Sequence, residues 1–255
     1  MSFRDDALVL IEELERYESV SRTATARVVG LAPMSHIERE LSLDRHLERG
    51  DLTGDEYRTF LRKYLDATTR LHDPRALAHQ VAVPHYSGAL AALVGAFTNN
   101  PMAIFEMGPA AVTVEYFLVN WLLKKVGWRP SSYSGHTGSN DTHGGGVLTH
   151  GGSLANLTAL IAARSKLLPN AWEDGTPNNL VILAPNDCHY SISRAAGILG
   201  IGSKAIVPLE VEADGTILPE RLGRTLDAVN PATDINHIKE LVGCIRTTSV
   251  ELQAR

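Results

Sequence analysis

The first 70 positions of the sequence carry apolar residues at the spacing of helices. In the first segment these residues are Ala7, Leu8, Ile11 and Leu14. A second helix is expected from Asp55 to about Leu65, with Thr53 placed to cap its start. Strand-like patterns occur only later in the chain. The pattern therefore predicts a helical N-terminal region.

Two more helices are predicted between residues 87 and 127. Ser87 can cap the first, and Asn99-Asn100-Pro101 ends it. Pro109 suits the first turn of the second helix, and Gly127 can end it in a left-handed conformation. Its apolar stripe consists of Val112, Tyr116, Val119, Leu123 and Val126.

From residue 146 onward, short apolar strands alternate with turns and helices. Strands are expected at residues 147–149, 180–183, 205–209 and 241–245. Helices are expected at residues 154–168, at 191–199 and from Pro219 onward. This alternation predicts an α/β domain with a largely parallel sheet, in which ligands bind beyond the carboxyl ends of the strands.

Composition narrows the classes of function. The 255 residues are 44% hydrophobic and 21% charged, which is typical of a soluble globular protein. A net charge of -5 and 6% aromatic residues argue against a nucleic-acid or anionic-membrane partner. No apolar run reaches the ~20 residues of a membrane helix, and the charged start carries no signal core. We therefore expect a cytoplasmic protein in which Cys188 and Cys244 stay reduced.

The stretch from Gly144 to Asn156 places glycines and a serine directly before a predicted helix. Glycine lets the backbone approach an anion closely, and the first amides of a helix point at it. Ser153 adds a hydroxyl donor. The stretch lacks both the Gly-Lys-Ser/Thr of nucleotide hydrolases and the dinucleotide fingerprint. It predicts a phosphate site, and a tight turn with Ser153 as helix cap is the structural alternative.

Two sets of histidines are candidates for chemistry. His189 follows the strand predicted at residues 180–183, which brings it beside the phosphate stretch if the strands are neighbours. An imidazole there can stack on a flat cofactor or exchange protons, although many single histidines are structural. A possible metal-hydrolase cluster consists of His136, Asp141, His143 and His150. These four lie in a Gly/Ser-rich loop without the defined ligand spacing of zinc sites, which disfavours a metal.

Several segments together carry a family resemblance. They are Thr149 to Leu157 with Ala163-Arg164, His189-Tyr190-Ser191 with Arg194-Ala195, Pro109-Ala110-Ala111 with Glu115 and Trp121, and Asp73 to Gln80. In order and spacing, over about residues 70 to 230, the chain resembles the group II pyridoxal-phosphate-dependent amino-acid decarboxylases. That family includes glutamate, aromatic-amino-acid and diaminobutyrate decarboxylases.

The resemblance implies an architecture. It implies a fold type I α/β large domain over residues 71–255, incomplete at its C-terminal end. A helical arm over residues 1–70 precedes this domain and interlocks a homodimer. The loop at Asn99-Asn100 would face the site of the partner subunit.

The resemblance also implies a cofactor site for pyridoxal 5'-phosphate. Gly152 and Ser153 would bind the cofactor phosphate, and His189 would stack on the pyridine ring as a catalytic residue. Gln80 is the candidate for substrate contact, which favours an acidic amino acid or diaminobutyrate.

The sequence departs from the family at two essential residues. The family places an aspartate and a Schiff-base lysine, the latter in a His-Lys pair, after the segment of His189. Neither is found in that context, and the six lysines considered are Lys63, Lys124, Lys125, Lys166, Lys204 and Lys239. We therefore expect a truncated decarboxylase, an enzyme by family, that acts on an L-amino acid. The alternative is a non-catalytic homologue that binds or dimerises with a full-length subunit.

Overall fold

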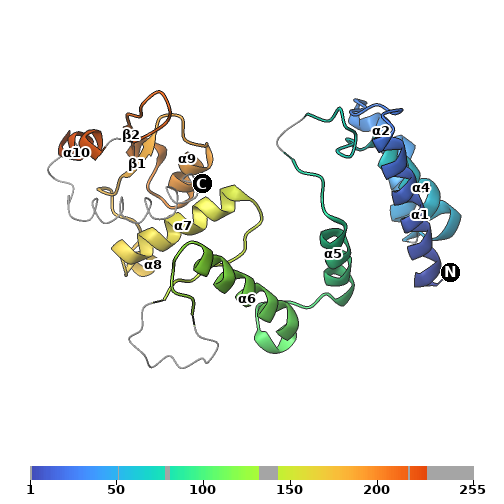
Figure 1. Cartoon of the computed structure of the whole chain (residues 1–255), viewed down its shortest axis with the longest axis horizontal. Helices are drawn as coiled ribbons and strands as arrows, with labels where there is room; N and C mark the ends of the chain where they lie inside the picture. Colours follow the sequence, from blue (N-terminus) through green and yellow to red (C-terminus); the bar gives the residue numbers. More distant parts are fainter. Residues whose placement is uncertain (1, 51, 78–80, 132–142, 218, 229–255) are drawn as a thin grey trace. The chain divides into compact units, whose positions relative to one another are not determined.

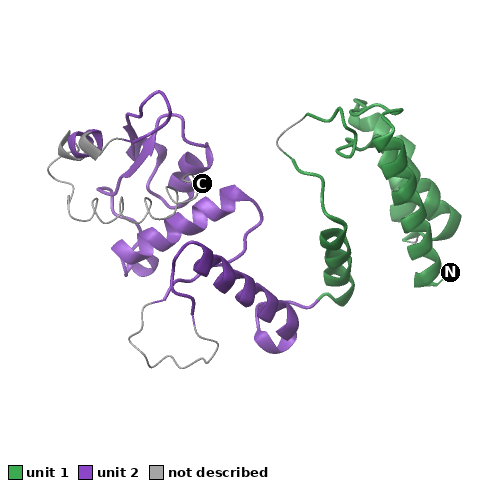
Figure 2. Cartoon of the chain, viewed as in Figure 1, with its two compact units in different colours: residues 1–99 green, residues 100–255 purple. Residues whose placement is uncertain are grey.

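The computed structural model describes residues 2–50, 52–77, 81–131, 143–217 and 219–228. The chain, drawn in Figure 1, divides into two units, residues 1–99 and 100–255, which Figure 2 shows in different colours. The division predicted at residue 70 concerns function, since it separates a dimer-forming arm from a cofactor-binding domain. It stays a prediction.

The first unit is helical, as predicted. Its helices are α1 (Phe3–Arg22), α2 (Met34–Leu41), α3 (Leu43–Arg49), α4 (Gly54–Ala67) and α5 (Tyr86–Thr98). Two predicted caps are wrong in detail. Thr53 precedes α4 without a capping hydrogen bond from its side chain, and the Gly54 N–H donates instead to Asp6 of α1 at 2.9 Å. At α5 the cap is His85, whose Nδ1 accepts the Ser87 N–H at 3.2 Å.

A buried carboxylate joins α1 to α4. Glu13 is 1% exposed and accepts hydrogen bonds from Arg62 at 2.6 Å and from Arg16 at 2.8 Å. The hydrogen bonds from Arg62 lower the pKa of Glu13 to about 2, against the opposing effect of burial. In the same way, hydrogen bonds from Arg75 lower the pKa of the buried Asp73 to about 2. The packing of these helices therefore depends on ion pairs.

The second unit combines helices with a small parallel sheet. Its elements are η1 (Phe105–Met107), α6 (Pro109–Lys125), α7 (Gly152–Leu167), α8 (Ala171–Asp174), β1 (Ile182–Pro185), α9 (Ser191–Ile198), η2 (Ser203–Ala205), β2 (Ile206–Leu209) and α10 (Pro219–Ala228). The strands β1 and β2 pair in parallel, with Ile182 opposite Ile206 and Pro185 opposite Leu209. This confirms the predicted alternation from β1 to α10, while the strand predicted at residues 241–245 lies outside the described residues.

An apolar core joins α7, β1 and α9. It consists of Leu160, Ile182, Ala184, Ala195, Ala196 and Leu199. Small alanine side chains on α9 let this helix approach the strand and α7 closely, because they add no bulk at the contact. Since both the phosphate stretch and the segment of His189 lead into these helices, the core positions the candidate site.

The strand predicted at residues 147–149 does not form. Residues 144–148 lie instead along α6, with its residues 123, 119 and 115 meeting residues 144, 146 and 148 in turn. The Leu148 N–H donates to the Glu115 carboxylate at 3.0 Å rather than to a neighbouring strand. A Cβ added at Gly146 would lie 3.0 Å from Val119 Cγ1, so this glycine serves close packing. The prediction was wrong because an apolar stretch becomes a strand only beside a ladder partner.

Both predicted ends of α6 are confirmed. Pro109 occupies its first turn, where a missing N–H costs nothing, and Gly127 follows the helix with φ +76°. Asn120 of α6 holds Ser131 by accepting its N–H at 3.1 Å and donating to its carbonyl at 3.2 Å, and the Gly144 N–H donates to the Arg129 carbonyl at 2.8 Å. Residues 131 and 144 are thus both held close to α6.

Candidate cofactor-binding site

The N-terminus of α7 presents unpaired backbone donors. Gly151 precedes the helix with φ +85° and ψ 159°, a conformation that is essentially restricted to glycine. The first N–H that bonds back to this turn is that of Ala155, which donates to the Gly151 carbonyl at 3.2 Å. Within the described part of the chain, the N–H groups of Gly152, Ser153 and Leu154 have no acceptor. Such a set of amides at the positive end of a helix dipole binds anions.

Among the described residues, the two glycines at this turn have open space at their Cβ positions. A Cβ added at Gly151 or Gly152 would meet nothing within 4 Å. Ser153 is half-buried in the first turn of the helix, and Gly151, not Ser153, is the N-cap residue. The interpretation of Ser153 as a mere helix cap is therefore wrong, and its hydroxyl remains available to a ligand.

His189 lies on the loop between β1 and α9, with its ring fixed by Ser191. The Nδ1 atom of His189 lies 2.8 Å from the Ser191 hydroxyl and accepts the Ser191 N–H at 3.2 Å. Ser191 in turn accepts a hydrogen bond of 2.8 Å from the Asn156 side chain of α7. The predicted proximity of His189 to the phosphate stretch thus arises through α7 and α9 rather than through adjacent strands.

An aromatic and a cationic group flank this histidine. The rings of His189 and Tyr190 have centroids 4.2 Å apart, and the Arg194 guanidinium lies 4.7 Å from the centre of the Tyr190 ring. His189 itself is exposed, so the ring is held in place yet accessible to a ligand.

Three residues of this arrangement were not singled out in the sequence: Asn156, Ser191 and Tyr190. Each lies inside a motif that carries the family resemblance, so the signal was present in the Gly-Gly-Ser-Leu-Ala-Asn and His-Tyr-Ser segments. What the motifs leave unstated is that Asn156 and Ser191 contact each other across 35 positions.

The other candidate residues fall outside this arrangement. Gln80 lies outside the described residues, as do His136 and Asp141 of the suggested metal cluster. Among the residues that are described, no group of three or more His, Cys, Asp or Glu side chains is arranged to hold a metal ion. Cys188 is a half-buried free thiol, and Cys244 is not described.

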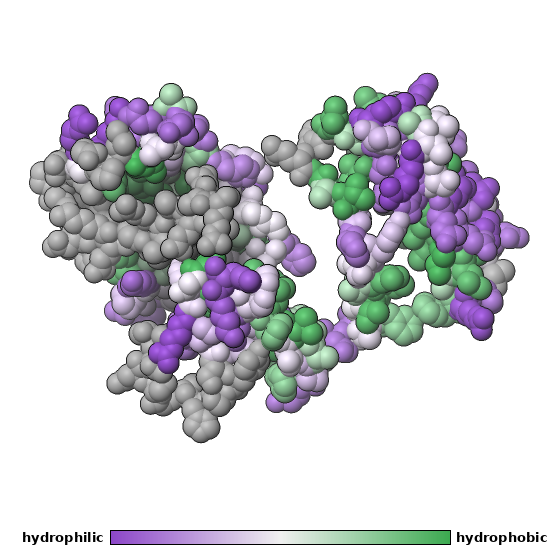
Figure 3. Space-filling view, in the orientation of Figure 1, coloured by the Kyte–Doolittle hydropathy of each residue, from purple (hydrophilic) through white to green (hydrophobic). Residues whose placement is uncertain are grey.

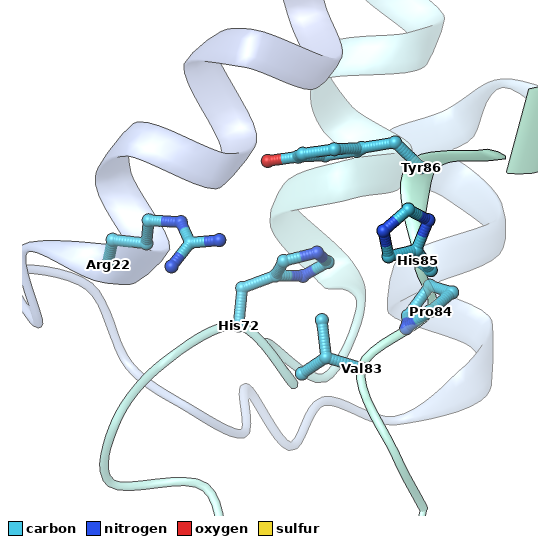
Figure 4. Close-up of a pocket in the computed structure, with 6 residues that line it drawn as sticks. All are labelled: Arg22, His72, Val83, Pro84, His85 and Tyr86. Atoms are coloured by element: carbon cyan, nitrogen blue, oxygen red, sulfur yellow. The ribbon is translucent and has the colours of Figure 1, made fainter.

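A pocket of about 250 Å³ lies in the first unit (Figure 4). Its lining consists of Arg22, His72, Val83, Pro84, His85 and Tyr86. The Arg22 guanidinium points toward the ring of His72, but Arg22 is already paired with Glu18 at 2.6 Å. The pocket therefore offers no uncompensated charge from Arg22 to an anion.

None of the helices in the described ranges has both the length and the apolar character that crossing a membrane requires.

Comparison with known proteins identifies the family. Residues 46–243 match the family model described as "Pyridoxal-dependent decarboxylase conserved domain". The chain belongs to this family. Its resemblance to the group II pyridoxal-phosphate-dependent decarboxylases is thereby confirmed.

Individual relatives agree with this membership. The acidic amino acid decarboxylase GADL1 of Bos taurus is 25% identical over 225 residues, which cover 86% of this chain and 39% of the bovine protein. The glutamate decarboxylase of Drosophila melanogaster is 30% identical over 134 residues, which cover 51% of this chain and 24% of the fly protein.

Solved structures agree on the fold. The crystal structure of mouse CSAD in apo form aligns with a TM-score of 0.72 and 20% identity, over 91% of this chain and 46% of the mouse chain. The predicted fold type I class is therefore confirmed, with the helical N-terminal region before it. The chain spans less than half the length of each of these three relatives.

The residues of the second unit fit the phosphate-bearing cofactor of this family. The amides of Gly152, Ser153 and Leu154 offer donors to a phosphate, and the two glycines at the turn have open space at their Cβ positions. His189 offers an accessible flat ring whose orientation is fixed. The amides begin α7 and His189 precedes α9, and these two helices pack against each other in one apolar core.

Proposed function

We propose that the protein is a pyridoxal-phosphate-dependent amino-acid decarboxylase and that this chain supplies the phosphate and ring contacts of its cofactor site. One observation carries the proposal: the unpaired amides at the start of α7 are tied to His189 through Asn156 and Ser191. Hydrogen-bond donors for a phosphate and an oriented imidazole ring are thus held in one packed unit. This arrangement suits a ligand with a phosphate at one end and an aromatic ring at the other.

The chemistry supplied by bound pyridoxal phosphate is delocalisation of the electron pair that remains when carbon dioxide leaves the substrate. The residues of this chain bind and orient. The amides of Gly152, Ser153 and Leu154, with the Ser153 hydroxyl, would donate to the phosphate dianion, and the helix dipole of α7 favours the negative charge. His189 would stack on the cofactor ring from its fixed position, as a catalytic residue.

Substrate and assembly are further parts of the proposal. The names of the relatives, acidic amino acid decarboxylase and glutamate decarboxylase, support an acidic substrate, with Gln80 as its contact. The apolar side chains that α5 leaves exposed, among them Leu90, Val94 and Phe97, support a homodimer. The free thiol of Cys188 agrees with a reducing compartment such as the cytoplasm.

A second candidate is a homologue that binds the cofactor, or a subunit of its kind, without turnover. These 255 residues contain no His-Lys pair, so binding of the cofactor and turnover by this chain are tested separately. The two candidates differ in one measurable property, the release of carbon dioxide from glutamate, aspartate or diaminobutyrate.

Cofactor binding is tested by thermal unfolding with and without pyridoxal phosphate, followed by borohydride reduction and mass analysis of tryptic peptides. We expect pyridoxal phosphate to raise the unfolding temperature of the protein. Ser153→Ala should weaken this protection, while Ser193→Ala, which removes an exposed hydroxyl of α9 that bonds only Tyr190, should leave it unchanged. Absence of any protection would overturn the proposal.

The reduction step separates the two candidates. A single stoichiometric adduct on one lysine, together with carbon dioxide release, would assign catalysis to this chain alone. Protection without an adduct or turnover would support cofactor binding by this chain. It would also mean that the Schiff-base lysine is not among these 255 residues. Sedimentation of the same sample tests the dimer, and a monomer at all concentrations would contradict it.

A further inference from the structure

The hydrogen bonds around His189 fix the position of the ring proton. The Ser191 N–H donates to Nδ1 at 3.2 Å, and the Ser191 hydroxyl lies 2.8 Å from the same nitrogen. A nitrogen that accepts an N–H cannot itself carry a proton in that direction. The neutral ring therefore carries its proton on Nε2, the nitrogen that points away from Ser191.

The direction of the hydroxyl of Ser191 is set from the other side. The Asn156 amide donates to this oxygen at 2.8 Å, so the hydroxyl proton is free to point at His189. Ser191 is 1% exposed, so its hydroxyl is shielded from bulk solvent. The relay Asn156–Ser191–His189 thus has one consistent set of donors and acceptors.

The relay connects the two halves of the cofactor site. Asn156 lies in the second turn of α7, close behind the amides of Gly152 and Ser153. Ser191 is the first residue of α9, and His189 lies just before it. A shift of α7 therefore moves Asn156, and through Ser191 it moves the ring of His189 as well.

We propose that Ser191 is a positioning residue: it holds His189 in the Nε2–H tautomer and, through Asn156, sets the ring in register with the anion-binding start of α7. The claim about the tautomer stands on the contacts of this chain alone. The claim about register rests on the proposed function, because it concerns how a ligand with both phosphate and ring is held.

The tautomer is measured directly in the protein without cofactor. Nitrogen NMR of the imidazole side chains distinguishes a protonated from an unprotonated ring nitrogen, and the signal of His189, one of 10 histidines, is assigned by its loss in His189→Gln. We expect the Nε2–H form in the wild-type protein. A wild-type spectrum with the proton on Nδ1 would overturn the proposal without any variant of Ser191.

Two variants then test the relay from its two ends. Ser191→Ala removes the hydroxyl, and loss of one net hydrogen bond should lower the ratio of Nε2–H to Nδ1–H by about fivefold. Asn156→Asp replaces the amide donor with a carboxylate that accepts, so the hydroxyl should turn away from His189 and lower the ratio likewise. Ser191→Thr keeps the hydroxyl and should restore the wild-type ratio.

Ser193→Ala is the matched control, since it makes the same chemical change two positions along α9 at an exposed site. It should leave the tautomer ratio unchanged. If Ser191→Ala fails to fold, as judged by circular dichroism, Asn156→Asp at a half-buried position decides the question. Unchanged ratios in the folded variants would overturn the relay.

Register is tested by comparing three ligands: pyridoxal phosphate, pyridoxal and inorganic phosphate. In Ser191→Ala we expect weaker binding of pyridoxal phosphate, by about fivefold, with binding of inorganic phosphate unchanged. Equal binding of pyridoxal phosphate by the variant and the wild type would overturn the claim that Ser191 aligns the ring of His189 with the start of α7. If the wild-type protein binds none of the three, the proposed function fails, whereas the tautomer result stands or falls by itself.

Discussion

The two units of the chain bury different kinds of side chain. In residues 1–99 the buried positions include the charged residues Glu13, Arg70 and Asp73 beside a few apolar ones. In residues 100–255 the centre of α7, β1 and α9 is apolar. Ion pairs hold the first arrangement and exclusion of water holds the second, so the two units should respond differently to pH and to core truncation.

The difference also bears on the site. The first unit leaves large apolar side chains exposed on α1 and α5, including Leu8, Ile11 and Phe97, and Figure 3 shows hydrophobic residues at the surface of both units. The proposed cofactor contacts belong to α7 and to the loop before α9, and these two helices share an apolar core that keeps their amides and side chains in fixed positions. Apolar packing is the better support for geometry, because it does not depend on protonation.

The chain offers a spectroscopic separation of the two units. All three tryptophans, Trp121, Trp128 and Trp172, lie in the second unit, so their emission reports on residues 100–255. Circular dichroism reports on the helices of both units. The following predictions use this separation.

The largest effect is expected in the apolar core of the second unit. Ile182 is 2% exposed and packs in the cluster with Leu160 and Ala196. Ile182→Ala should lower the free energy of unfolding by ~2–5 kcal/mol, measured by denaturant titration of tryptophan emission. Ile198→Ala removes the same atoms from a side chain that is 64% exposed and should cost less than ~0.5 kcal/mol. Equal losses in the two variants would refute an apolar core at this place.

The next effect concerns the backbone at the start of α7. Gly151 has φ +85° and ψ 159°, so Gly151→Ala should cost ~1–3 kcal/mol in backbone strain. It should also weaken binding of pyridoxal phosphate, because strain relief would turn the amides of residues 152–154. Gly197→Ala, in the last turn of α9 with open space around its Cβ position, should stabilise the protein by ~0.5–1 kcal/mol. A neutral effect of Gly151→Ala would mean that this conformation is not required.

A smaller effect, confined to the first unit, is expected for Glu13→Gln. The amide keeps the shape but weakens the hydrogen bonds from Arg62 and Arg16, whose exposure limits the cost to ~1–2 kcal/mol. Circular dichroism should register the loss of stability, and tryptophan emission should not. A simultaneous change in both signals would contradict the assignment of this ion pair to the first unit alone.

The same residue predicts a response to acid. The pKa of Glu13 is lowered from 4.5 to about 2, so its stabilising contribution is present above pH 4.5 and is lost as the pH falls toward 2. Wild-type helicity should therefore fall over this range before tryptophan emission changes. Glu13→Gln should show a smaller fall, with Asp73 accounting for part of the remainder.

The smallest effect concerns the packing of residues 144–148 against α6. Gly146→Ala places a Cβ 3.0 Å from Val119 Cγ1 and should cost about 1 kcal/mol, since a side-chain methyl can yield slightly. Gly145→Ala meets nothing within 4 Å and should be neutral or slightly stabilising. Denaturant titration of tryptophan emission compares the two variants. If Gly145→Ala were the more damaging, the packing along α6 would be disproved.

Sequence reasoning succeeded where the signals are local. Pro109 and the apolar stripe behind it predict α6, and the glycines before Ser153 predict that a helix follows, although α7 begins at Gly152 rather than at residue 154. Each of these signals needs only its immediate neighbours. It failed at residues 147–149, whose conformation depends on Glu115, 33 positions earlier in the chain. No local pattern predicts which of two acceptors, a strand or a carboxylate, will meet a given N–H.

The local patterns of the sequence indicated the family and the longer helices, and they predict an anion site at the glycine-rich start of α7. The folded structure alone shows that Ser191 and Asn156 hold His189, and that Glu13 is buried among arginines. The physical reason is range: caps, turns and helical stripes are set within a few residues. A buried hydrogen bond across 35 positions, as between Asn156 and Ser191, depends on how whole helices pack.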